Sequence, residues 1–342
     1  MIVIGGGFAG SLAARKFEGA FDVTLIDSKN YFEFTPGILR TIVEPEHLDK
    51  IQILHSDYFH GRIIVGHVKE VARESVSVNG EKIEFDYLVI SSGSGYNMPF
   101  KEEDIVIAAR GEHLKKYHLA LQKAKKVLIV GGGLVGVELA GEIADHYNDK
   151  EITIVHGREK LIERNPIEAS SYAESFLKRN GVKIFFNEIV KRKEGKHFIS
   201  ENGNKYSTDL AFLCTGITPN YEFLKKHFSK FIGKQGIEVN GHLQVNGFSN
   251  IFAAGDITAI KEEKTAQNAE TQAEIVVHNI KALEKRIKLR KYESKKTPLV
   301  ISLGKYNGIF IWKRFVLTGW IPALMKWGIE KKEIFRRKWI CW

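Results

Sequence analysis

The sequence predicts an α/β protein in which one strand–helix–strand unit occurs twice. The first copy begins with an apolar strand at Ile2–Ile4, continues through the glycine turn Gly5–Gly10, and reaches a second strand that ends at Asp27. The second copy has the same order, with a strand at Lys126–Val130 and a glycine turn at Gly131–Gly136. A unit of this kind joins two parallel strands through a helix. The chain is therefore expected to contain two nucleotide-binding domains.

The three glycines of each turn have separate physical roles. In a βαβ unit the first permits a tight turn, the second lets the backbone approach a diphosphate, and the third lets the helix pack closely on the strand. The diphosphate then lies on the free N–H groups at the start of the helix. The two Rossmann-like cradles predicted in this way comprise Gly5, Gly7, Phe8, Ala9 and Gly10, and Gly131, Gly133, Leu134, Val135 and Gly136. Because each turn follows an apolar strand and precedes a helix, the pair is far more specific than a single glycine motif.

The second strand ends differently in the two copies. Asp27 ends the first, where a carboxylate can accept hydrogen bonds from ribose hydroxyl groups. In the second copy the strand Glu151–Val155 is followed by His156 and Arg158, with no carboxylate. These two side chains would tolerate or favour a 2′-phosphate, so both NADH and NADPH remain candidates.

Composition excludes several classes of protein. The chain has 342 residues, of which 44% are hydrophobic, and this suits a folded protein of two domains. Its two cysteines, Cys214 and Cys341, are too few for a disulfide framework or a four-cysteine metal site, and no metal site is expected. The chain opens on an apolar strand, so no secretory signal is expected, and no uncharged apolar run approaches the roughly 18 residues of a membrane-spanning helix.

The C-terminal segment is strongly basic and rich in tryptophan. Residues 281–342 carry 17 Lys and Arg against 4 Asp and Glu, a net charge of +13, and contain all five tryptophans. Large apolar residues recur at spacings of three and four, which predicts one face of a helix: Trp312, Val316, Trp320, Leu324 and Trp327. Pro322 is expected to bend or divide this helix.

This combination predicts an amphipathic segment that lies on a membrane surface. Tryptophan prefers the headgroup level of a bilayer, and basic side chains attract anionic lipid. A basic helix with an aromatic face lies in the interface plane and does not cross it. The alternative is a helix that packs on the first domain or on a partner in a homodimer. No nucleic-acid partner is expected, because no recognised nucleic-acid module is visible.

Three further motifs give the chain a family resemblance. Asp86–Gly93 and Asp209–Gly216 each combine an apolar strand with a terminal glycine, and Asn250–Asp256 resembles a flavin fingerprint. Together with the glycine turns, they resemble the pyridine nucleotide-disulfide oxidoreductase superfamily of flavoproteins with two dinucleotide-binding domains. Within it the chain is most similar to type II NADH:quinone oxidoreductases and to the related apoptosis-inducing-factor-like quinone reductases.

The resemblance implies a division into domains, with one inserted in the other. The expected limits are residues 1–108 and 235–295 for the FAD-binding domain, 109–234 for the NAD(P)H-binding domain, and 296–342 for the C-terminal membrane-surface segment. Linkers are expected around Arg110–Gln122 and Lys230–Val239.

The resemblance also assigns residues to the cofactor sites. In the family the aspartate of the fingerprint binds the ribityl chain of FAD, a role that would fall to Asp256 here. Thr35 and Pro36 resemble the loop that lines the flavin ring. The remaining residues expected at the cofactors are Val68, Ser92, Gly93, Gly216, Gly255, Thr265 and Ala266.

Glu138, Gln267 and Gln272 are the candidates for catalysis that the resemblance implies. The family has an Ala-Gln-x-Ala-x-Gln stretch on a helix whose start faces the flavin and the quinone tunnel. Gln267 matches it, whereas Thr271 replaces the next glutamine and Gln272 follows. An ordinary polar helix face is the alternative. Glu138 matches a family glutamate that would hold the nicotinamide amide or relay a proton to reduced flavin, unless it only complements the helix dipole.

These features predict a peripheral protein at the cytoplasmic face of a membrane, acting as an FAD-dependent NAD(P)H:quinone oxidoreductase. Hydride would pass from NAD(P)H to FAD and two electrons to a membrane quinone, without proton pumping. The protein would mainly place the two rings, since the cofactors supply the bond chemistry. The stretch Asn30–Gly37 lacks the cysteine pair of disulfide reductases. A sulfide:quinone oxidoreductase and an NAD(P)H-binding redox-sensing protein are the alternatives, although Cys214 is expected in the core.

Overall fold

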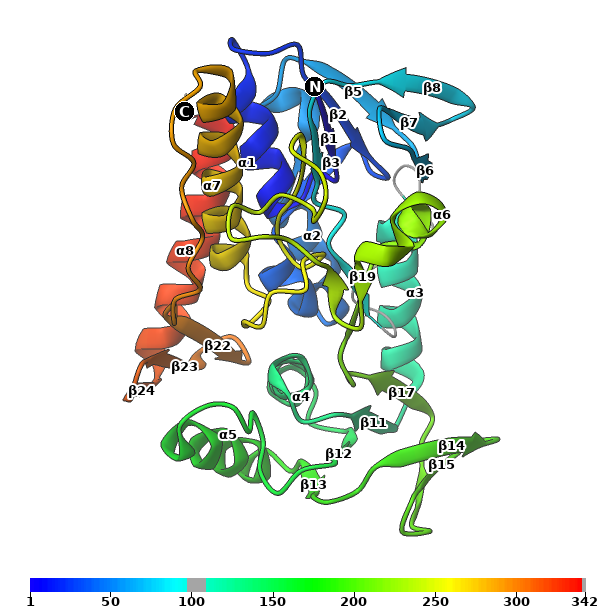
Figure 1. Cartoon of the computed structure of the whole chain (residues 1–342). Helices are drawn as coiled ribbons and strands as arrows, with labels where there is room; N and C mark the ends of the chain where they lie inside the picture. The colour runs from blue at the N-terminus through cyan, green and yellow to red at the C-terminus, as the bar shows by residue number, and fades with distance from the viewer. Residues whose placement is uncertain (97–108, 340–342) are drawn as a thin grey trace.

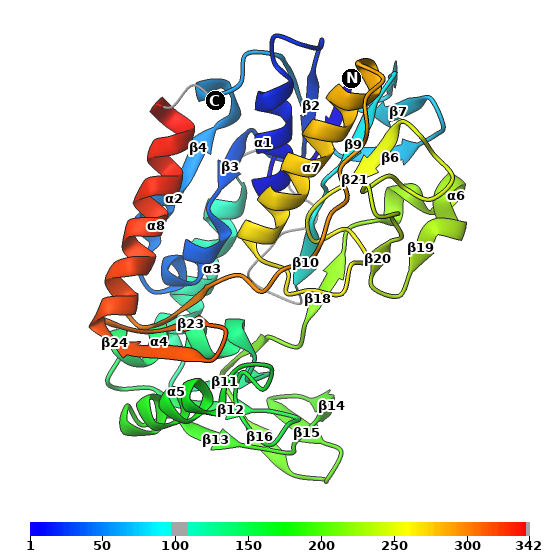
Figure 2. The ribbon, with the colours of Figure 1, turned by 60° about the vertical axis from the view of Figure 1, so that its left-hand side comes forward.

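The fold is given by a computed structural model that describes residues 1–96 and 109–339 (Figure 1). Its first sheet has five parallel strands in the order β21-β9-β1-β2-β5. They are β1 (Ile2–Ile4), β2 (Thr24–Asp27), β5 (Arg62–Val65), β9 (Leu88–Ile90) and β21 (Ile251–Ala253). Helix α1 (Phe8–Phe17) packs on this sheet, and α7 (Ala266–Glu284) lies beside α1 (Figures 1 and 2).

The second sheet has four parallel strands in the order β13-β12-β11-β17. They are β11 (Lys126–Val130), β12 (Glu151–Val155), β13 (Lys183–Phe185) and β17 (Leu210–Leu213), with α4 (Leu134–His146) and α5 (Ile167–Arg179) as the associated helices. An antiparallel sheet of β14 (Val190–Glu194), β15 (His197–Ser200) and β16 (Lys205–Ser207) lies next to it.

The two parallel sheets confirm the predicted α/β class with Rossmann-like units. β21 belongs to the first sheet although it follows the second in sequence, so the chain leaves the first sheet, builds the second and returns. The predicted domain limits remain predictions, and the limit at residue 108 lies outside the described residues.

Small antiparallel sheets and short helices complete the first half of the chain. They are β3 (Tyr31–Glu33) with β4 (Gln52–Leu54), β6 (Val68–Val71) with β7 (Ser75–Val78) and β8 (Glu81–Glu84), η1 (Thr35–Ile42), η2 (Pro45–His47), α2 (Leu48–Ile51) and η3 (His55–Asp57). β10 (Ser94–Tyr96) pairs with β18 (Ile217–Pro219) and so joins the two halves. The turn at Asn79-Gly80 joins β7 to β8, with positive φ at both residues.

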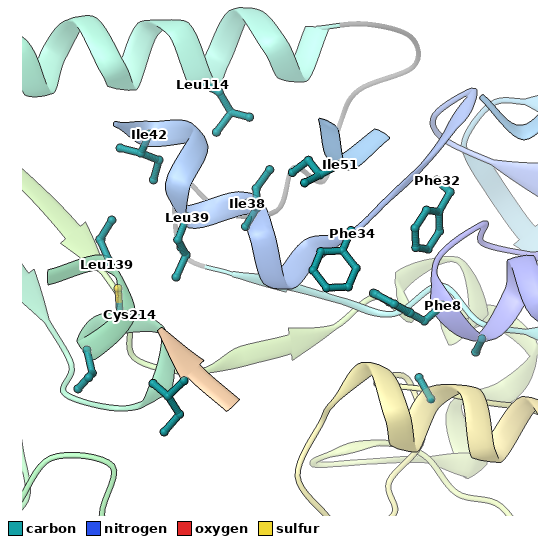
Figure 3. Packing of buried hydrophobic residues seen from close by; sticks show 14 of the residues in the cluster. Phe8, Phe32, Phe34, Ile38, Leu39, Ile42, Ile51, Leu114, Leu139 and Cys214 are labelled. Carbon is teal, nitrogen blue, oxygen red and sulfur yellow. The ribbon is translucent and has the colours of Figure 1, made fainter. Parts of the chain in front are cut away.

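The predicted linker Arg110–Gln122 is wrong, because this segment lies within α3 (Ala109–Lys123). Leu114 and Leu121 are buried, and Figure 3 shows Leu114 directed toward Ile38 and Ile42 of η1. These leucines are two helical turns apart, and lysines and a histidine lie between them. The sequence therefore lacks the recurring apolar residues that would have predicted a helix here.

The second predicted linker, Lys230–Val239, is not a plain connection either. It contains the hairpin of β19 (Ile232–Gly233) and β20 (Gly236–Ile237), and Ile237 is buried. The short helices η4 (Glu222–Leu224), α6 (Lys225–Phe228) and η5 (Ser229–Phe231) precede the hairpin.

The single helix predicted through Trp312, Val316 and Trp327 is also wrong. β22 (Leu299–Leu303), β23 (Asn307–Trp312) and β24 (Phe315–Gly319) form an antiparallel sheet, and α8 (Trp320–Trp339) follows. Lys313, at the turn between β23 and β24, has a positive φ that a helix does not allow. Pro322 neither bends nor divides α8, because it lies in the first turn, where no backbone N–H is needed.

α8 runs along one side of the molecule, from the β22–β24 sheet near α4 to α2 and β4 (Figures 1 and 2). None of the helices in residues 1–96 and 109–339 is long and apolar enough to span a membrane. The core is continuous between these parts, and Figure 3 shows Phe8, Phe34, Leu39, Leu139 and Cys214 in one cluster. Burial raises the pKa of the Cys214 thiol, which confirms the expectation that this cysteine is part of the core.

Candidate functional site

The first glycine turn is shaped by close backbone contacts. Gly5 has a φ of +92°, and a Cβ there would lie 2.3 Å from the carbonyl oxygen of Ser91. A Cβ on Gly10 would lie 1.8 Å from the carbonyl oxygen of Gly5. By contrast, no atom of the described chain lies within 4 Å of the Cβ position of Gly7, the residue that precedes α1. The fold itself therefore requires Gly5 and Gly10, whereas Gly7 leaves open space before the helix.

The second turn repeats this geometry. Gly131 has a φ of +112° and a Cβ position 2.4 Å from the carbonyl oxygen of Cys214, and the Cβ position of Gly136 is 1.9 Å from the carbonyl oxygen of Gly131. Around Gly133, within the part of the chain that is described, the space is again open. Neither α1 nor α4 has an acidic residue in its first turn, so both N-termini are suited to an anion such as a diphosphate.

Asp27 stabilises the first turn from the end of β2. Its Oδ2 accepts a hydrogen bond of 2.9 Å from the backbone N–H of Gly6 and lies 3.1 Å from Nε2 of His55. Burial alone would raise the pKa of Asp27, but the charge of Lys29 and the hydrogen bond from His55 outweigh it and lower the pKa to about 2. The carboxylate is thus ionised at neutral pH, as ribose recognition requires.

His156 takes the structural place of Asp27 in the second copy. The backbone N–H of Gly132 donates a 3.0 Å hydrogen bond to His156 Nδ1, which therefore carries no proton. Burial lowers the pKa of this imidazole, so the ring is neutral at neutral pH. His156 consequently offers no positive charge to a 2′-phosphate, and exposed Arg158 is the cation of the predicted pair that remains.

Replacing Arg158 with glutamate is expected to weaken NADPH binding about tenfold, or roughly 1.4 kcal/mol, and NADH binding much less. The reason is that the reversed charge would repel a phosphate at the 2′ position. Dissociation constants from titration with each nucleotide measure the effect. Arg179→Glu, at the exposed end of α5, is the matched control. If the binding of NADPH and of NADH weakened equally, Arg158 would not be the residue that contacts the 2′-phosphate.

Four other residues predicted at FAD follow the carboxyl ends of β9 and β21, namely Ser92, Gly93, Gly255 and Asp256. Ser94 Oγ donates a 2.7 Å hydrogen bond to Asp256 Oδ2. The side chains of Ser92 and Asn220 each donate a hydrogen bond to the backbone carbonyl oxygen of the other residue. The backbone N–H of Asn220 donates to the carbonyl of Gly93. In an open parallel sheet this edge is where ligands bind. Thr35, Pro36 and Val68 begin η1 and β6, and Gly216 has open space at its Cβ position within the described chain.

Gln272 is held inside the fold by hydrogen bonds. It is 1% exposed, its Oε1 accepts a 2.7 Å hydrogen bond from the backbone N–H of Gly255, and its Nε2 donates to Glu262. It therefore holds the turn before Asp256, and its role in catalysis stays a prediction. The spacing of the sequence motif did not predict this. Thr271 occupies the position of the family glutamine and is exposed, whereas Gln272, one residue later, lies on the buried face of α7.

Three other predicted residues, Thr265, Ala266 and Gln267, lie at the start of α7 and are less buried than Gln272. Thr265 caps the helix by accepting a hydrogen bond from the backbone N–H of Asn268, and Ala266 is the first helical residue. Gln267 is exposed.

Glu138 joins three elements. Its Oε1 accepts hydrogen bonds from the backbone N–H and the hydroxyl of Ser302 in β22 and from Lys326 in α8. Its place is beyond the first turn of α4, so it is not a simple partner of the helix dipole.

A pocket of about 380 Å³ lies between η1, α4, the β22–β23 turn and α8. Its wall is largely apolar, and the polar side chains on it are Arg40, His47, Glu142, Ser302, Lys305, Tyr306, Lys326 and Glu330. Pro36, predicted at the flavin ring, lines it as well, whereas Trp320 and Trp327 line it from α8.

Most of these charged residues were not predicted. Arg40 binds buried Glu142 through Nε and Nη2, at 3.2 and 3.1 Å. Burial raises the pKa of Glu142, although the charges of Arg40 and Lys326 oppose the rise. One available signal was that Glu142 follows Glu138 by four residues, which places both on one face of a helix. The partners from η1 and α8 had no such local signal.

The sequence profile of the pyridine nucleotide-disulphide oxidoreductases matches residues 1–273. The chain belongs to this family. It is 32% identical to apoptosis-inducing factor homolog B of Dictyostelium discoideum, over 99% of this chain and 95% of that protein. This oxidoreductase thus has the two predicted cofactors, FAD and NAD(H), for which the two glycine turns provide the fitting geometry.

Two solved structures share the fold. The sulfide:quinone oxidoreductase of Aquifex aeolicus has a TM-score of 0.82 and 21% identity, over 98% of this chain and 91% of that one. The NDH2 of Plasmodium falciparum in complex with NADH also has a TM-score of 0.82, with 16% identity, over 99% of this chain and 98% of that one. At such identities the similarity defines the fold and leaves the acceptor open.

Proposed function

We propose that this oxidoreductase is a non-proton-pumping NAD(P)H:quinone reductase of the type II class, which transfers two electrons through FAD to a membrane quinone. The observation that carries the proposal is the pocket between Pro36 and α8, because it connects the predicted flavin-side loop with tryptophans near the C-terminus. The quinone named for the Aquifex structure is in keeping with such an acceptor.

The two glycine turns would hold the two nucleotides. The N-terminus of α1 would hold the FAD diphosphate, Asp27 its ribose and Asp256 the ribityl chain, while α4 would hold the diphosphate of NAD(P)H. Bound FAD supplies the chemistry of accepting a hydride and releasing two electrons. The chain itself would orient the two rings and exclude water from them. Holding reacting groups in the right geometry lowers the activation barrier for transfer between them.

The pocket has the size and lining of a quinone site. Its volume of about 380 Å³ is within the usual range of small-molecule pockets. A largely apolar wall that also carries polar side chains suits a quinone, which has an apolar ring and polar carbonyl oxygens. Leu324 and Trp327, at the α8 side, are 55% exposed, so an apolar surface continues outward from the pocket. A lipid-dissolved acceptor could enter by this side.

We also propose that the protein is peripheral and lies at the cytoplasmic face of the membrane; the aromatic surface of the C-terminal segment supports the membrane association. Trp312 and Phe315 flank Lys313 and Arg314 at the tip of the β23–β24 hairpin, and all four are exposed. Large rings beside cations are the composition that binds an anionic lipid surface. Arg336 and Arg337 belong to internal ion pairs, so the lipid-facing charge is smaller than the net charge of the segment indicates.

Replacing Trp312 and Phe315 with serine is expected to lower binding to anionic vesicles on the order of 100-fold. Each large side chain moved out of water contributes about 1.5–3 kcal/mol, and these two do not line the pocket. Cosedimentation with vesicles of phosphatidylglycerol and phosphatidylcholine measures the change. Phe185→Ser, an exposed aromatic residue of β13, is the control. Unchanged binding would place the membrane contact elsewhere.

The proposed reaction is tested by the flavin spectrum. NADH or NADPH should bleach the flavin within milliseconds to seconds, and a short-chain quinone should restore the colour. Bleaching by sulfide and not by NADH would favour a sulfide:quinone oxidoreductase, although Cys214, the free cysteine of the described chain, is buried. Slow bleaching with a retained charge-transfer band would favour the redox-sensing alternative.

A further inference from the structure

A buried pair of titratable side chains forms part of the pocket wall. His47, at the end of η2, is 6% exposed, and Glu330, in the middle of α8, is 7% exposed. His47 Nε2 lies 3.1 Å from Glu330 Oε2, and both residues line the pocket. They stand far apart in sequence, so only the fold brings them together.

The pair lies close to the loop that was predicted to line the flavin. Glu330 Oε2 is 3.0 Å from the point where a Cβ on Gly37 would stand. Gly37 directly follows Pro36, and both residues line the pocket. A quinone ring held against Pro36 would therefore have the carboxylate within its reach.

The other charged groups of the pocket are less suited to moving protons. Arg40 stays protonated in proteins and binds both oxygens of Glu142. Lys326 donates hydrogen bonds to the side chains of Glu138 and Ser302. Among the described residues that line the pocket, His47 is the histidine, the residue type that most often serves as a general acid or base.

We propose that His47 and Glu330 act together as the proton donor to the quinone oxygen, an inference that rests on the proposed quinone reduction. Reduction of a quinone to a quinol takes up two electrons and two protons. Bound FAD would supply both electrons and one proton as a hydride equivalent. The second proton is the one shared by His47 and Glu330: an O–H bond forms on the quinol as the N–H or O–H bond of the pair breaks. The pair is left as neutral imidazole and carboxylate and takes up a proton from water.

The test compares two acceptors in the variants His47→Gln and Glu330→Gln. Ferricyanide takes electrons without protons, whereas the quinone needs both. We expect quinone reduction to fall about 100-fold, since a general acid contributes at least that factor, while flavin bleaching by NADH and ferricyanide reduction stay within twofold. His60→Gln, which removes an exposed histidine, is the matched control and should leave both acceptors unchanged.

Two further measurements separate proton transfer from a structural role. Quenching of the fluorescence of Trp320 and Trp327 by a quinone analogue reports binding without turnover and should give dissociation constants within twofold of the unaltered protein. The pH profile of quinone reduction should lose its alkaline limb in both variants. That limb reflects the pair within the field of Arg40, Glu142, Glu138, Lys326 and Lys305, which surround it from η1, α4, α8 and the β22–β23 turn.

The possible outcomes are distinct. Equal losses with quinone and ferricyanide, weaker quinone binding at an unchanged pH profile, or full quinone activity in both variants would each overturn the inference. Retained ferricyanide activity shows that a variant is folded. If the unaltered protein bleached with NADH but did not pass electrons to any quinone, the proposed function would fail and not merely the role of the pair.

Discussion

Gly7→Val is expected to give a folded but colourless protein, whereas Gly133→Val should give a yellow protein that NADH no longer bleaches at low concentration. Gly7 has a φ of −74° and a ψ of −160°, an extended conformation that valine adopts readily. Because no described atom lies near its Cβ position, the fold itself can accept the side chain. The branched side chain would instead occupy the space before α1, where the FAD diphosphate must approach.

The same reasoning applies at the second turn. Gly133 has a φ of −74° and a ψ of −171°, and it precedes α4 with open space around its Cβ position within the described residues. The effect of each substitution should be on the order of 100-fold in nucleotide affinity, about 2.7 kcal/mol. Since the two turns are alike in geometry, the two variants control for each other. One should lose only FAD, and the other should lose only tight NADH binding.

Absorbance spectra of the purified proteins measure FAD content, thermal melting measures folding, and stopped-flow bleaching measures NADH binding. Gly10→Ala provides the contrast, because its Cβ would lie 1.8 Å from the carbonyl oxygen of Gly5 and must disturb the packing of α1 on β1. It is expected to lower the melting temperature. A Gly7→Val protein with a full complement of flavin would refute the assignment of the first turn.

The glycine turns were predictable because their determinants are local. A turn between an apolar strand and a helix is encoded in about ten consecutive residues, and the strands Lys126–Val130 and Glu151–Val155 are found at the predicted positions. The fingerprint strand β21 was found for the same reason, as part of Asn250–Asp256.

The pocket was not predictable, because its wall combines residues from four separate stretches of the chain. Nothing near His47 in sequence indicates that Glu330 will face it. Likewise, Trp312 and Trp327 fit one helical stripe by spacing alone, although a hairpin turn at Lys313 separates them. Periodicity cannot distinguish such a coincidence from a helix when a strand and a helix follow each other directly.

Net charge was the least informative signal at the end of α8. Arg336 and Arg337 count as two cations of a basic cluster in the sequence. In the structure Arg337 donates to Glu333 at 2.6 Å and to Glu270 of α7 at 3.0 Å, and Arg336 also binds Glu270. Pairing across helices depends on tertiary contacts, so charge counting overestimated the charge available to lipid.

Arg337→Ala is expected to destabilise the protein by about 3–5 kcal/mol, because it leaves Glu270 and Glu333 with too little positive charge. Arg337 is 3% exposed and its guanidinium carbon lies 3.8 Å from the ring centroid of Phe32. Unfolding in urea measures the loss. Lys338→Ala, at the exposed next position, should change the free energy of unfolding by less than about 0.5 kcal/mol.

The deficit should depend on pH in a defined direction. Burial already raises the pKa of Glu270, against the opposing charge of Arg337. Without Arg337 this pKa rises further, and a carboxyl group whose pKa is raised in the folded state destabilises the fold only where it is ionised. The difference between Arg337→Ala and the unaltered protein should therefore shrink as the pH falls from 8 to 5. A difference that does not change over this range would mean that lost packing on Phe32 dominates.

A second substitution separates charge from packing. In the Arg337→Ala background, Glu270→Gln should recover part of the stability, because a neutral amide needs no counter-charge, whereas the same substitution alone should be destabilising. Arg337 also lies 5.3 Å from the ring centroid of Phe8, the first residue of α1, and donates to Ser11 in the same helix. Loss of Arg337 should accordingly lower FAD retention too, and recovery of flavin content together with stability in the double variant would tie the anchoring of α8 to the first nucleotide cradle.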